Sequence, residues 1–215
     1  MLIIGAGGLA SEILEIIHRQ GLTNDLAFYD DVNHYSDYRL FDNFPILSNL
    51  EAAKFYLSTT SPNVILGVGT PSTRKFLADK FTSLGGVLTS TIDNRAIIGS
   101  YGVEVGDGCN ILAGAAVSNK VKIGKGCLIY YNSSITHDCH LGNFVEVSPG
   151  AQILGRVAIG NYASIGSNST ILPDVTVGSG AIVGAGAVVT KNVPENCVVV
   201  GIPARVIRKN QDFAT

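Results

Sequence analysis

Charge is scarce in this chain of 215 residues, and neither sign dominates. Lysine and arginine total 15, aspartate and glutamate total 17, and charged residues make up 15% of the sequence. No segment concentrates basic side chains enough to exploit phosphate charge, so we expect neither nucleic acid nor a membrane surface as a partner. A long hydrophobic run is also lacking, because the apolar start at residues 1–4 ends at Gly5. That start is too short for a signal peptide or a membrane-spanning helix, which predicts a cytoplasmic protein.

Cysteine and histidine are few, with four residues of each. No Cys-x-x-Cys pair occurs, and Cys109, Cys127 and Cys139 fall at repeat positions that require a small buried side chain. We therefore expect reduced thiols that behave as small hydrophobic groups. His137 and His140 are three residues apart, but no third histidine or well-placed carboxylate completes a set of zinc ligands, so we expect no metal. The sequence also contains no serine or cysteine nucleophile elbow.

A period of six residues runs through residues 105–194. From Val105 to Val189, every sixth residue is a branched aliphatic, fifteen times in succession. The fifth position of each block is small or β-branched, and glycine, asparagine, aspartate and lysine are frequent between these two positions. The pattern is unbroken over the whole stretch.

This period predicts a parallel β-helix. An α-helix has 3.6 residues per turn, and a simple alternating strand does not require a unit of six. In a β-helix, the aliphatic and small positions point inward and fill a narrow prismatic core, while glycine and asparagine turn the corners. Three blocks make one coil, so residues 105–194 form five coils that rise about 4.8 Å each.

Residues 1–91 have a different pattern, in which strands and helices alternate. This alternation predicts a small α/β domain with a parallel sheet covered by helices. Ser48 and Glu51 have the spacing of a capping box at the start of one helix. The expected strands are 2–4, 26–29, 45–47, 63–68 and 87–92, and the expected helices are 10–20, 48–57 and 72–84.

The domain boundary is expected near Thr91, because blocks of six begin at Ile92. One residue is inserted before Val105, after which the phase is strict. We therefore divide the chain into residues 1–91 and residues 92–215. The chain is expected to leave the β-helix after Pro194 and to end in a frayed tail at residues 211–215.

The glycine-rich turn of Gly5, Gly7 and Gly8 lies between the first strand and the first helix. Such glycines let the backbone approach a pyrophosphate, and the helix N-terminus offers free N–H groups. Asp30 and Asp31 end the second strand, where a carboxylate can accept from a ribose hydroxyl or a base N–H. The motif alone fits a structural turn, an NAD site or another nucleotide site. About ninety residues supply one nucleotide-binding half, which favours a single nucleotide diphosphate.

Arg74 follows the third predicted strand, near the expected sheet edge. Its guanidinium is a candidate partner for phosphate, and a solvated helix charge is the alternative. Both interpretations stay open on the sequence.

His137 and Asp138 are the candidate catalytic residues. His137 takes the third position of its block, an outward-facing corner, so it does not pack in the core. One coil is 18 residues, which places His137 under Gly155, and we expect the missing side chain to leave room for substrate beside the imidazole. Histidine suits the removal of a proton from an amine near neutral pH, and Asp138 can orient the ring. An exposed corner histidine without function is the alternative.

The blocks of six, together with residues 198–205 (Val-Val-Val-Gly-Ile-Pro-Ala-Arg), resemble the hexapeptide-repeat acyltransferases. That resemblance implies a left-handed β-helix and a homotrimer. With the small α/β domain included, essentially the whole chain resembles the bacterial sugar acetyltransferases, which comprise PglD-like nucleotide-aminosugar N-acetyltransferases and sialic acid O-acetyltransferases. The fold class implied is a Rossmann-like domain followed by a left-handed parallel β-helix.

The family resemblance implies roles for several of these residues. The Gly5–Gly8 turn and Asp30–Asp31 would hold a nucleotide-linked sugar, although Leu9 stands where the family commonly has a histidine. His137, followed by an acidic residue and a cysteine, matches the family's catalytic histidine. Glu146 stands where some relatives have a second histidine.

Acetyl-CoA in the family lies in a groove between adjacent β-helices of the trimer. By this resemblance Gly155, Ser167 and Ala185 would line the pantetheine track. Ile202 and Pro203 would meet the adenine, and Lys209 or Arg208 would meet the phosphates, with an ordinary solvated tail as the alternative for these two bases.

The function expected is therefore acetyl-CoA-dependent N-acetylation of a nucleotide-linked 4-amino-4,6-dideoxysugar in a cytoplasmic homotrimer. His137 would act as the general base, and the backbone N–H of Gly155 would meet the oxyanion. O-acetylation of a sialic-acid-type sugar is the alternative reaction. A nucleotide-binding β-helix scaffold without catalysis is the alternative from another class.

Overall fold

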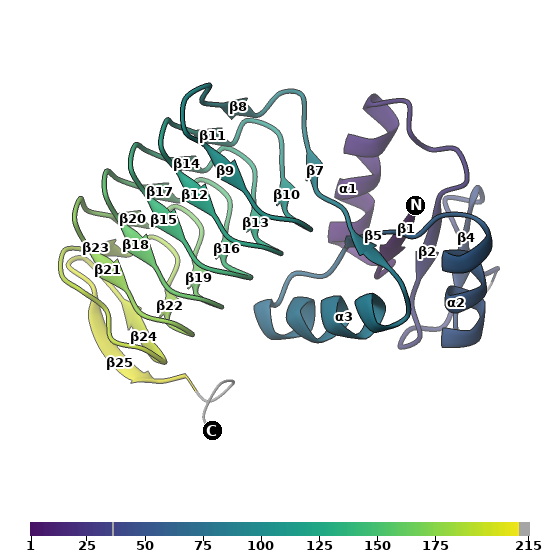
Figure 1. The fold of residues 1–215 in the computed structure, drawn as a ribbon. Helices are drawn as coiled ribbons and strands as arrows, with labels where there is room; N and C mark the ends of the chain where they lie inside the picture. Colours follow the sequence, from purple (N-terminus) through teal and green to yellow (C-terminus); the bar gives the residue numbers. More distant parts are fainter. Residues whose placement is uncertain (36, 211–215) are drawn as a thin grey trace. The chain divides into compact units, whose positions relative to one another are not determined.

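The computed structural model describes residues 1–35 and 37–210. The chain divides into two compact units, Met1–Thr91 and Ile92–Thr215, shown in Figure 1. The tail expected at residues 211–215 lies outside the described residues. Each unit has its own hydrophobic core.

The first unit is a six-stranded sheet in the order β3-β4-β2-β1-β5-β6. All neighbouring strands are parallel except β3 and β4, which are antiparallel. The strands are β1 (Leu2–Ile4), β2 (Ala27–Tyr29), β3 (Arg39–Leu40), β4 (Phe44–Leu47), β5 (Asn63–Leu66) and β6 (Val87–Leu88), and the helices are α1 (Gly8–Arg19), α2 (Leu50–Thr59) and α3 (Pro71–Ser83).

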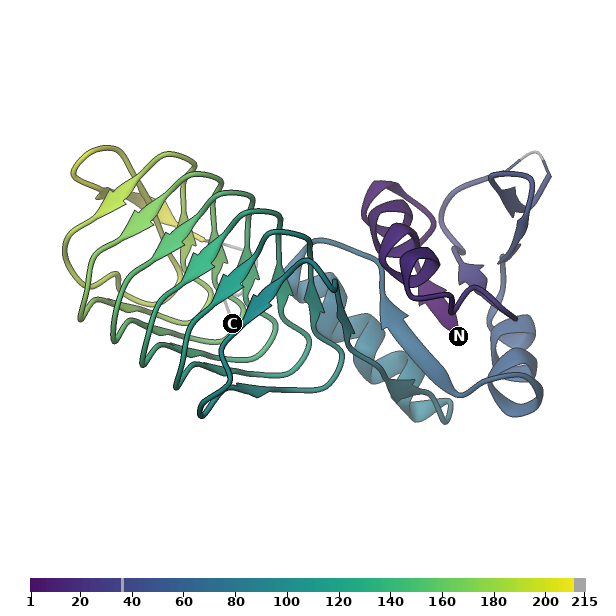
Figure 2. The same cartoon turned by 90° about the horizontal axis from the view of Figure 1, so that it is seen from above.

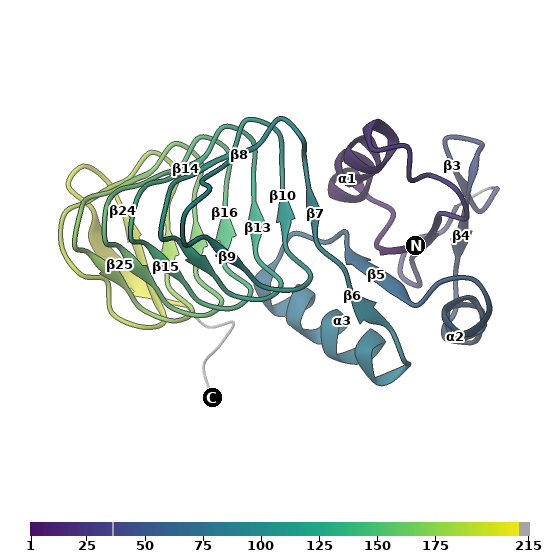
Figure 3. The same ribbon diagram turned by 45° about the horizontal axis from the view of Figure 1, so that its top comes forward.

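Helices cover both faces of this sheet, as Figure 3 shows. Ala53 and Leu57 of α2 and Phe81 of α3 pack with Leu2 and Ile4 on one face. The other face belongs to α1: a side chain added at Gly67 would meet both Ile3 of the sheet and Ala10 of the helix. The predicted Rossmann-like domain is confirmed.

Two local predictions in this unit were wrong. Helix α2 begins at Leu50 rather than Ser48, because the Asn49 side chain accepts the hydrogen bond from the Ala52 N–H at 2.9 Å and caps the helix. The short strand β3 lies in a segment that was expected to be loop. Two residues of antiparallel pairing are too few to produce a hydrophobic period in the sequence.

The second unit is the predicted left-handed parallel β-helix, whose coils stack regularly when seen from above in Figure 2. Residues 18 apart pair in register, as Ser134 does with Gln152. The first face holds β7 (Thr91–Ile92), β10 (Asn110–Ile111), β13 (Leu128–Ile129), β16 (Glu146–Val147), β19 (Ser164–Ile165), β22 (Ile182–Val183), β24 (Cys197–Val200) and β25 (Arg205–Lys209).

The other two faces contain only two-residue strands. The second face holds β8 (Ile97–Ile98), β11 (Ala116–Val117), β14 (Ser134–Ile135), β17 (Gln152–Ile153), β20 (Thr170–Ile171) and β23 (Val188–Val189). The third face holds β9 (Glu104–Val105), β12 (Lys122–Ile123), β15 (His140–Leu141), β18 (Ala158–Ile159) and β21 (Thr176–Val177).

The core of the β-helix consists of the first and fifth positions of the blocks. Three of its cysteines are buried free thiols, as predicted, and each one also donates a hydrogen bond. Cys109, Cys127 and Cys139 donate to backbone carbonyls 15 residues further along, each at 3.1 Å. The thiols therefore fill the core and satisfy a polar group at the same time.

Each corner of the β-helix contains one residue per coil with positive φ, and the three corners fill that position differently. One corner alternates glycine and asparagine (Gly114, Asn132, Gly150, Asn168, Gly186). The second, the aromatic corner, contains Gly108, Gly126, Phe144, Tyr162 and Gly180. The third, the charged corner, contains Gly102, Lys120, Asp138, Arg156 and Asp174.

The chain stays with the β-helix beyond Pro194, contrary to expectation. Strand β24 pairs in parallel with β22, and β25 turns back antiparallel to β24 at the end of the first face. Of the helices within residues 1–35 and 37–210, none has the length and apolar character needed to cross a membrane.

The core packing predicts that Ile153→Ala destabilises the β-helix. Ile153 is fully buried, and its truncation removes packing from a narrow core that cannot easily collapse. We expect a loss of about 2–5 kcal/mol in the free energy of unfolding. Guanidinium unfolding followed by circular dichroism measures it. Thr176→Ala, at an exposed position of β21, is the control, and equal stability of the two variants would contradict the prediction.

Candidate functional site

A pocket of about 470 Å³ lies in the first unit at the carboxyl ends of β1, β2 and β5. This edge of a parallel sheet is where α/β folds bind nucleotides. The structure brings Gly5, Asp30 and Asp31 together there. The pocket is lined by Ile4, Gly5, Tyr29, Asp30, Asp31, Val32, Asn33, Val68, Thr73, Phe76, Leu77 and Lys80.

The glycines of the turn have different reasons for being glycine. Gly5 has φ of +102°, and an added Cβ would lie 2.9 Å from the Gly67 carbonyl oxygen, so no other residue fits. Open space surrounds Gly7 and Gly8. Gly7 caps α1 without a side-chain hydrogen bond, and the first turn of α1 contains no acidic residue. The start of α1 therefore presents backbone N–H groups at an uncovered helix end, which suits an anion.

Asp30 is one of the residues that line the pocket. It is buried, and its carboxylate accepts hydrogen bonds from the N–H groups of Val32 and Asn33, the Asn33 amide and the Tyr35 hydroxyl, at 2.7 to 3.0 Å. Burial alone would raise the pKa of Asp30, but these hydrogen bonds outweigh burial and hold the pKa below its usual value. Its first role is therefore to shape the loop after β2, whereas we expected it to contact the ligand.

Asp31 has a more accessible side chain, at 38% exposure. The Tyr29 hydroxyl donates to it at 2.6 Å, and the Lys80 ammonium lies 3.3 Å from the same oxygen. The hydrogen bond from Tyr29, together with Lys80, lowers the pKa of Asp31. Asp31 is therefore a fixed carboxylate at the rim of the pocket.

Lys80 is a pocket residue that the sequence analysis missed. It lies on α3, and its ammonium also sits over the rings of Tyr29 and Phe76, at 5.6 and 5.9 Å from their centroids. The pocket face of α3 consists of Thr73, Phe76, Leu77 and Lys80. Their spacing of three, four and seven residues along one helix is the signal that could have identified them.

Arg74, the predicted phosphate ligand, does not line this pocket. It is fully buried, and its guanidinium donates to the Gly69 carbonyl. The alternative of a solvated helix charge was wrong. Leu9, at the position where the family commonly has a histidine, packs inward with 9% exposure.

His137 and Asp138 occupy one turn of the charged corner, between β14 and β15. His137 Nδ1 lies 2.8 Å from Asp138 Oδ2, and the two side chains are 53% and 42% exposed. The hydrogen bond with His137 lowers the pKa of Asp138, and the positive charges of Lys120 and Arg156 act in the same direction. A carboxylate at Nδ1 favours the tautomer with the proton on Nδ1, which leaves Nε2 as a proton acceptor. Within residues 1–35 and 37–210, no side chain or backbone group bonds to Nε2.

Gly155 lies directly against the His137 ring, one coil further along. A Cβ at this position would lie 2.7 Å from His137 Cε1 and 2.8 Å from Nε2. The space was expected to admit substrate, but the imidazole itself takes it. Glycine is therefore needed for the ring to lie over the next coil.

Gly155 also presents an uncapped backbone N–H. At comparable corner positions an asparagine one coil on accepts from this group: Asn119 caps Tyr101, and Asn143 caps Lys125. Residue 173, one coil after Gly155, is a proline and has no such acceptor. The described part of the chain offers the Gly155 N–H no hydrogen-bond partner.

The residues predicted to contact acetyl-CoA lie on different corners. Gly155 belongs to the charged corner, whereas Ser167 and Ala185 lie beside the glycine and asparagine corner. These two corners border the second face, where a groove of about 280 Å³ runs from Ile97 to Thr136. Ile202 and Pro203 lie in the turn between β24 and β25, and Lys209 ends β25.

Two further residues of the β-helix lie apart from this turn. Glu146 lies on the first face and accepts from the Ser148 hydroxyl at 3.5 Å. His140 lies on β15 of the third face, exposed to solvent, between Lys122 and Ala158. In the chain outside residues 36 and 211–215, no three His, Cys, Asp or Glu side chains are grouped to hold a metal ion.

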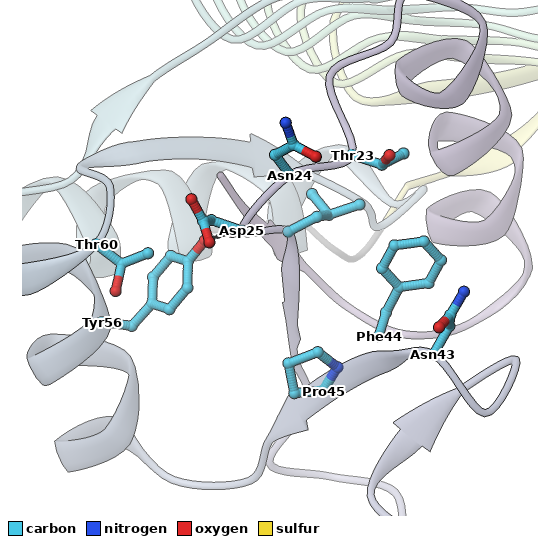
Figure 4. A pocket seen from close by; sticks show the side chains of 9 residues that line it. Thr23, Asn24, Asp25, Asn43, Phe44, Pro45, Tyr56 and Thr60 are labelled. Carbon is cyan, nitrogen blue, oxygen red and sulfur yellow. Dashed lines mark hydrogen bonds between the residues drawn. The ribbon is translucent and has the colours of Figure 1, made fainter.

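A second pocket of the first unit, about 540 Å³, lies before the amino end of β2 and contains none of the predicted residues. Figure 4 shows Tyr56 and Asp25 on one side of it and Asn43 and Phe44 on the other. The Tyr56 hydroxyl is already bonded to the Asp25 and Met1 carbonyls. Two lining residues on the same side of this pocket, Tyr56 and Asp25, are therefore already bonded to each other.

Comparisons with known proteins match both units. Residues 1–81 match the family model described as PglD N-terminal domain, and residues 138–172 and 156–191 match the bacterial transferase hexapeptide repeat. No curated protein sequence matches the chain significantly.

Solved structures resemble the chain over nearly its full length. A perosamine N-acetyltransferase from Caulobacter crescentus, in complex with CoA and GDP-perosamine, is 27% identical with a TM-score of 0.89, covering 97% of this chain and 96% of that chain. That structure carries a histidine-to-asparagine substitution. The acetyltransferase domain of PglB from Neisseria gonorrhoeae, in complex with acetyl coenzyme A, is 29% identical with a TM-score of 0.85, over 96% and 98% of the two chains. WeeI from Acinetobacter baumannii is 29% identical with a TM-score of 0.86, over 96% and 98%.

The hydrogen bonds of Asp30 predict that Asp30→Asn weakens the first unit at neutral pH. An amide cannot accept all of these bonds, and we expect a loss of about 1.5–3 kcal/mol in the free energy of unfolding. Because the folded-state pKa of Asp30 is depressed, its contribution is present above its unfolded pKa and is lost as pH falls through the folded value.

The measurement is urea unfolding of both proteins at pH 7, 5 and 3, followed by circular dichroism. The difference in stability should shrink toward pH 3. Asp79→Asn, at an exposed carboxylate of α3, is the control. A difference that stays constant with pH would contradict this assignment.

Proposed function

We propose that this chain, which belongs to the PglD-like family of hexapeptide-repeat sugar acetyltransferases, transfers an acetyl group from acetyl-CoA to the amine of a nucleotide-linked sugar. The acceptor that we propose is a nucleotide-linked 4-amino-4,6-dideoxysugar. Solved structures that resemble this chain over nearly its full length contain CoA together with GDP-perosamine, or acetyl coenzyme A. These ligands support acetyl-CoA as the donor and a nucleotide-linked aminosugar as the acceptor.

The observation that carries the proposal is the His137–Asp138 turn. Asp138 holds Nδ1 at 2.8 Å, so Nε2 is left as the proton acceptor. The sugar amine attacks the thioester carbonyl, a C–N bond forms, and the amine proton passes to Nε2. Collapse of the tetrahedral intermediate breaks the C–S bond, and the imidazolium returns the proton to the departing CoA thiolate. No covalent enzyme intermediate is required.

The oxyanion of that intermediate needs a donor beside the base. The backbone N–H of Gly155 is adjacent to the His137 ring and has no partner in the described part of the chain. A fixed N–H that requires no reorganisation stabilises developing negative charge efficiently. Gly155 would therefore contribute its backbone to the reaction, and its missing side chain would make room for the imidazole.

The pocket at the carboxyl edge of the first unit is the proposed nucleotide site. The start of α1 at Gly7 and Gly8 would face the diphosphate, and Asp31 would accept from a ribose hydroxyl or a base N–H. The Lys80 ammonium adds a positive charge to the rim, in a pocket that the carboxylates would otherwise make unfavourable for an anion. Arg74 would support the wall from inside.

Acetyl-CoA binding is the reason to propose a homotrimer. Gly155 lies on one corner, and Ser167 and Ala185 lie beside another. A groove between adjacent β-helices would join the charged corner of one subunit to the other corner of its neighbour. Ile202, Pro203 and Lys209 would meet the adenine and phosphate end. We also propose a cytoplasmic location, where acetyl-CoA and nucleotide sugars are available.

The first test is thiol release from acetyl-CoA with UDP-, dTDP- and GDP-linked 4-amino-4,6-dideoxysugars, beside free sialic acid. His137→Asn should reduce turnover by about 10²–10⁴ because the base is lost. His140→Asn is the matched control, since this histidine lies three residues away on a strand of the third face. It should keep the activity of the unaltered chain.

Each outcome has a separate meaning. Turnover of sialic acid and of no nucleotide sugar would show that the reaction is O-acetylation rather than N-acetylation. Equal loss in both histidine variants would show that the loss is not specific to the base. Binding of CoA without turnover on any acceptor would contradict the acceptor class, and absence of CoA binding would favour a scaffold.

The nucleotide site gives an independent prediction. Lys80→Met should raise the KM for the nucleotide sugar about tenfold, because one charge interaction with the diphosphate is worth about 1.4 kcal/mol. The KM for acetyl-CoA should not change. Lys75→Met, on the same helix but paired with Asp79, is the control. If Lys80→Met leaves the KM for the nucleotide sugar unchanged, Lys80 does not contribute to nucleotide binding.

A further inference from the structure

The charged corner forms a ladder of alternating charge beside the candidate base. Lys120, Asp138, Arg156 and Asp174 follow one another at intervals of 18 residues, so each lies one coil beyond the last. Their backbones are tied coil to coil: the N–H groups of Asp138, Arg156 and Asp174 donate to carbonyls of the preceding coil at 3.0 to 3.2 Å. The four side chains therefore stand in one row, at a coil spacing of about 4.8 Å.

The ladder uses residues that this backbone conformation disfavours. All four have φ between 58° and 64°, where glycine, asparagine and aspartate are favoured and lysine and arginine are not. The same position in the glycine and asparagine corner contains only Gly and Asn. Lys120 and Arg156 thus accept an unfavourable backbone conformation in the row that contains Asp138. Phe144 and Tyr162 do so in the aromatic corner, so the charged corner is the row in which charged side chains occupy this position.

Asp138 has a cation on each side, yet it bonds to His137. Lys120 Nζ lies 3.9 Å from Asp138 Oδ1, at the limit of an ion pair, while Oδ2 holds His137 at 2.8 Å. Arg156 does not bond to Asp138. Its guanidinium makes a bidentate pair with Asp174 instead, with Nε–Oδ1 at 2.6 Å and Nη2–Oδ2 at 2.8 Å.

We propose that Asp174 is a positioning residue for the catalytic turn: it holds the Arg156 guanidinium away from Asp138, so that the Asp138 carboxylate stays on His137. A bidentate arginine pair is the strongest hydrogen-bonding arrangement open to a carboxylate at this surface. Without Asp174, Arg156 would pair with Asp138, its other neighbour in the row. The carboxylate would turn from Nδ1, and the imidazole would lose its fixed tautomer. This inference rests on the proposed role of His137.

The test uses Asp174→Asn, Arg156→Gln and the double variant. Asp174→Asn should lower kcat/KM about tenfold, less than the about 10²–10⁴ expected when the base is removed, with little change in the KM for either substrate. The double variant should recover most of the loss, because the released guanidinium is gone. Glu104→Gln is the matched control: it removes a carboxylate from another exposed pair between coils, with Lys122 at 3.0 Å, and should leave kcat/KM unchanged.

A readout that does not depend on turnover accompanies the kinetics. The ¹⁵N shifts of the His137 ring report whether the proton is held on Nδ1. They should indicate the Nδ1–H tautomer in the unaltered chain and in the double variant, and a mixture of tautomers in Asp174→Asn. The charged groups around the Asp138 carboxylate are His137, Lys120 and Arg156, and Arg156 in turn pairs with Asp174. Cys139, the next residue, is buried.

The outcomes separate this proposal from the one it rests on. If the tautomer changes as expected but His137→Asn retains turnover, the ladder positions the ring and the ring is not the base. If Asp174→Asn behaves like Glu104→Gln in both readouts, the proposal is wrong. If Arg156→Gln fails to rescue Asp174→Asn, the pair stabilises the coil only, and the positioning role is overturned.

Discussion

The stacking of identical coils is the constraint on which this structure depends. Each coil hydrogen-bonds to the next in register, and through the middle of the stack the neighbour of residue i is residue i+18. The inward positions are then obliged to be aliphatic or small, and the corners are obliged to adopt positive φ. Outward side chains escape the demand of the core, although those at a corner, such as Asp138, still have positive φ. The candidate site residues of the second unit lie at outward positions, where a histidine lies over a glycine and a carboxylate lies between two cations.

The same constraint explains how a histidine can be held firmly on a surface. An exposed histidine and aspartate in solution would lose much of their pairing to water and to rotamer entropy. Here the ring rests against Gly155, and the neighbouring carboxylate is set by a backbone turn that the coils on either side fix. Rigid supporting structure takes the place of burial, so the ring stays exposed to solvent while its geometry is restricted.

The sequence predicted the β-helix well because its period is long, regular and tied to one packing rule. It also predicted that His137 stacks against Gly155, since the 18-residue coil converts distance along the chain into contact. It failed where neighbours come from unrelated segments. Lys80 of α3 joins Asp31, which follows β2. Arg74 was expected near the surface and is buried, because position on a helix does not reveal which side the sheet will cover.

The coil length also restricts how this protein can change over evolutionary time. One residue added between His137 and Gly155 would move every later side chain by a position, so that glycine would no longer lie beneath the imidazole and the alternation of charge along the corner would be lost. The single inserted residue that the chain does contain precedes Val105, in the first coil, ahead of all these partners. Variation in length is therefore confined to the ends of the stack, or to whole coils gained and lost together. Between these limits, divergence must proceed by substitution at outward positions.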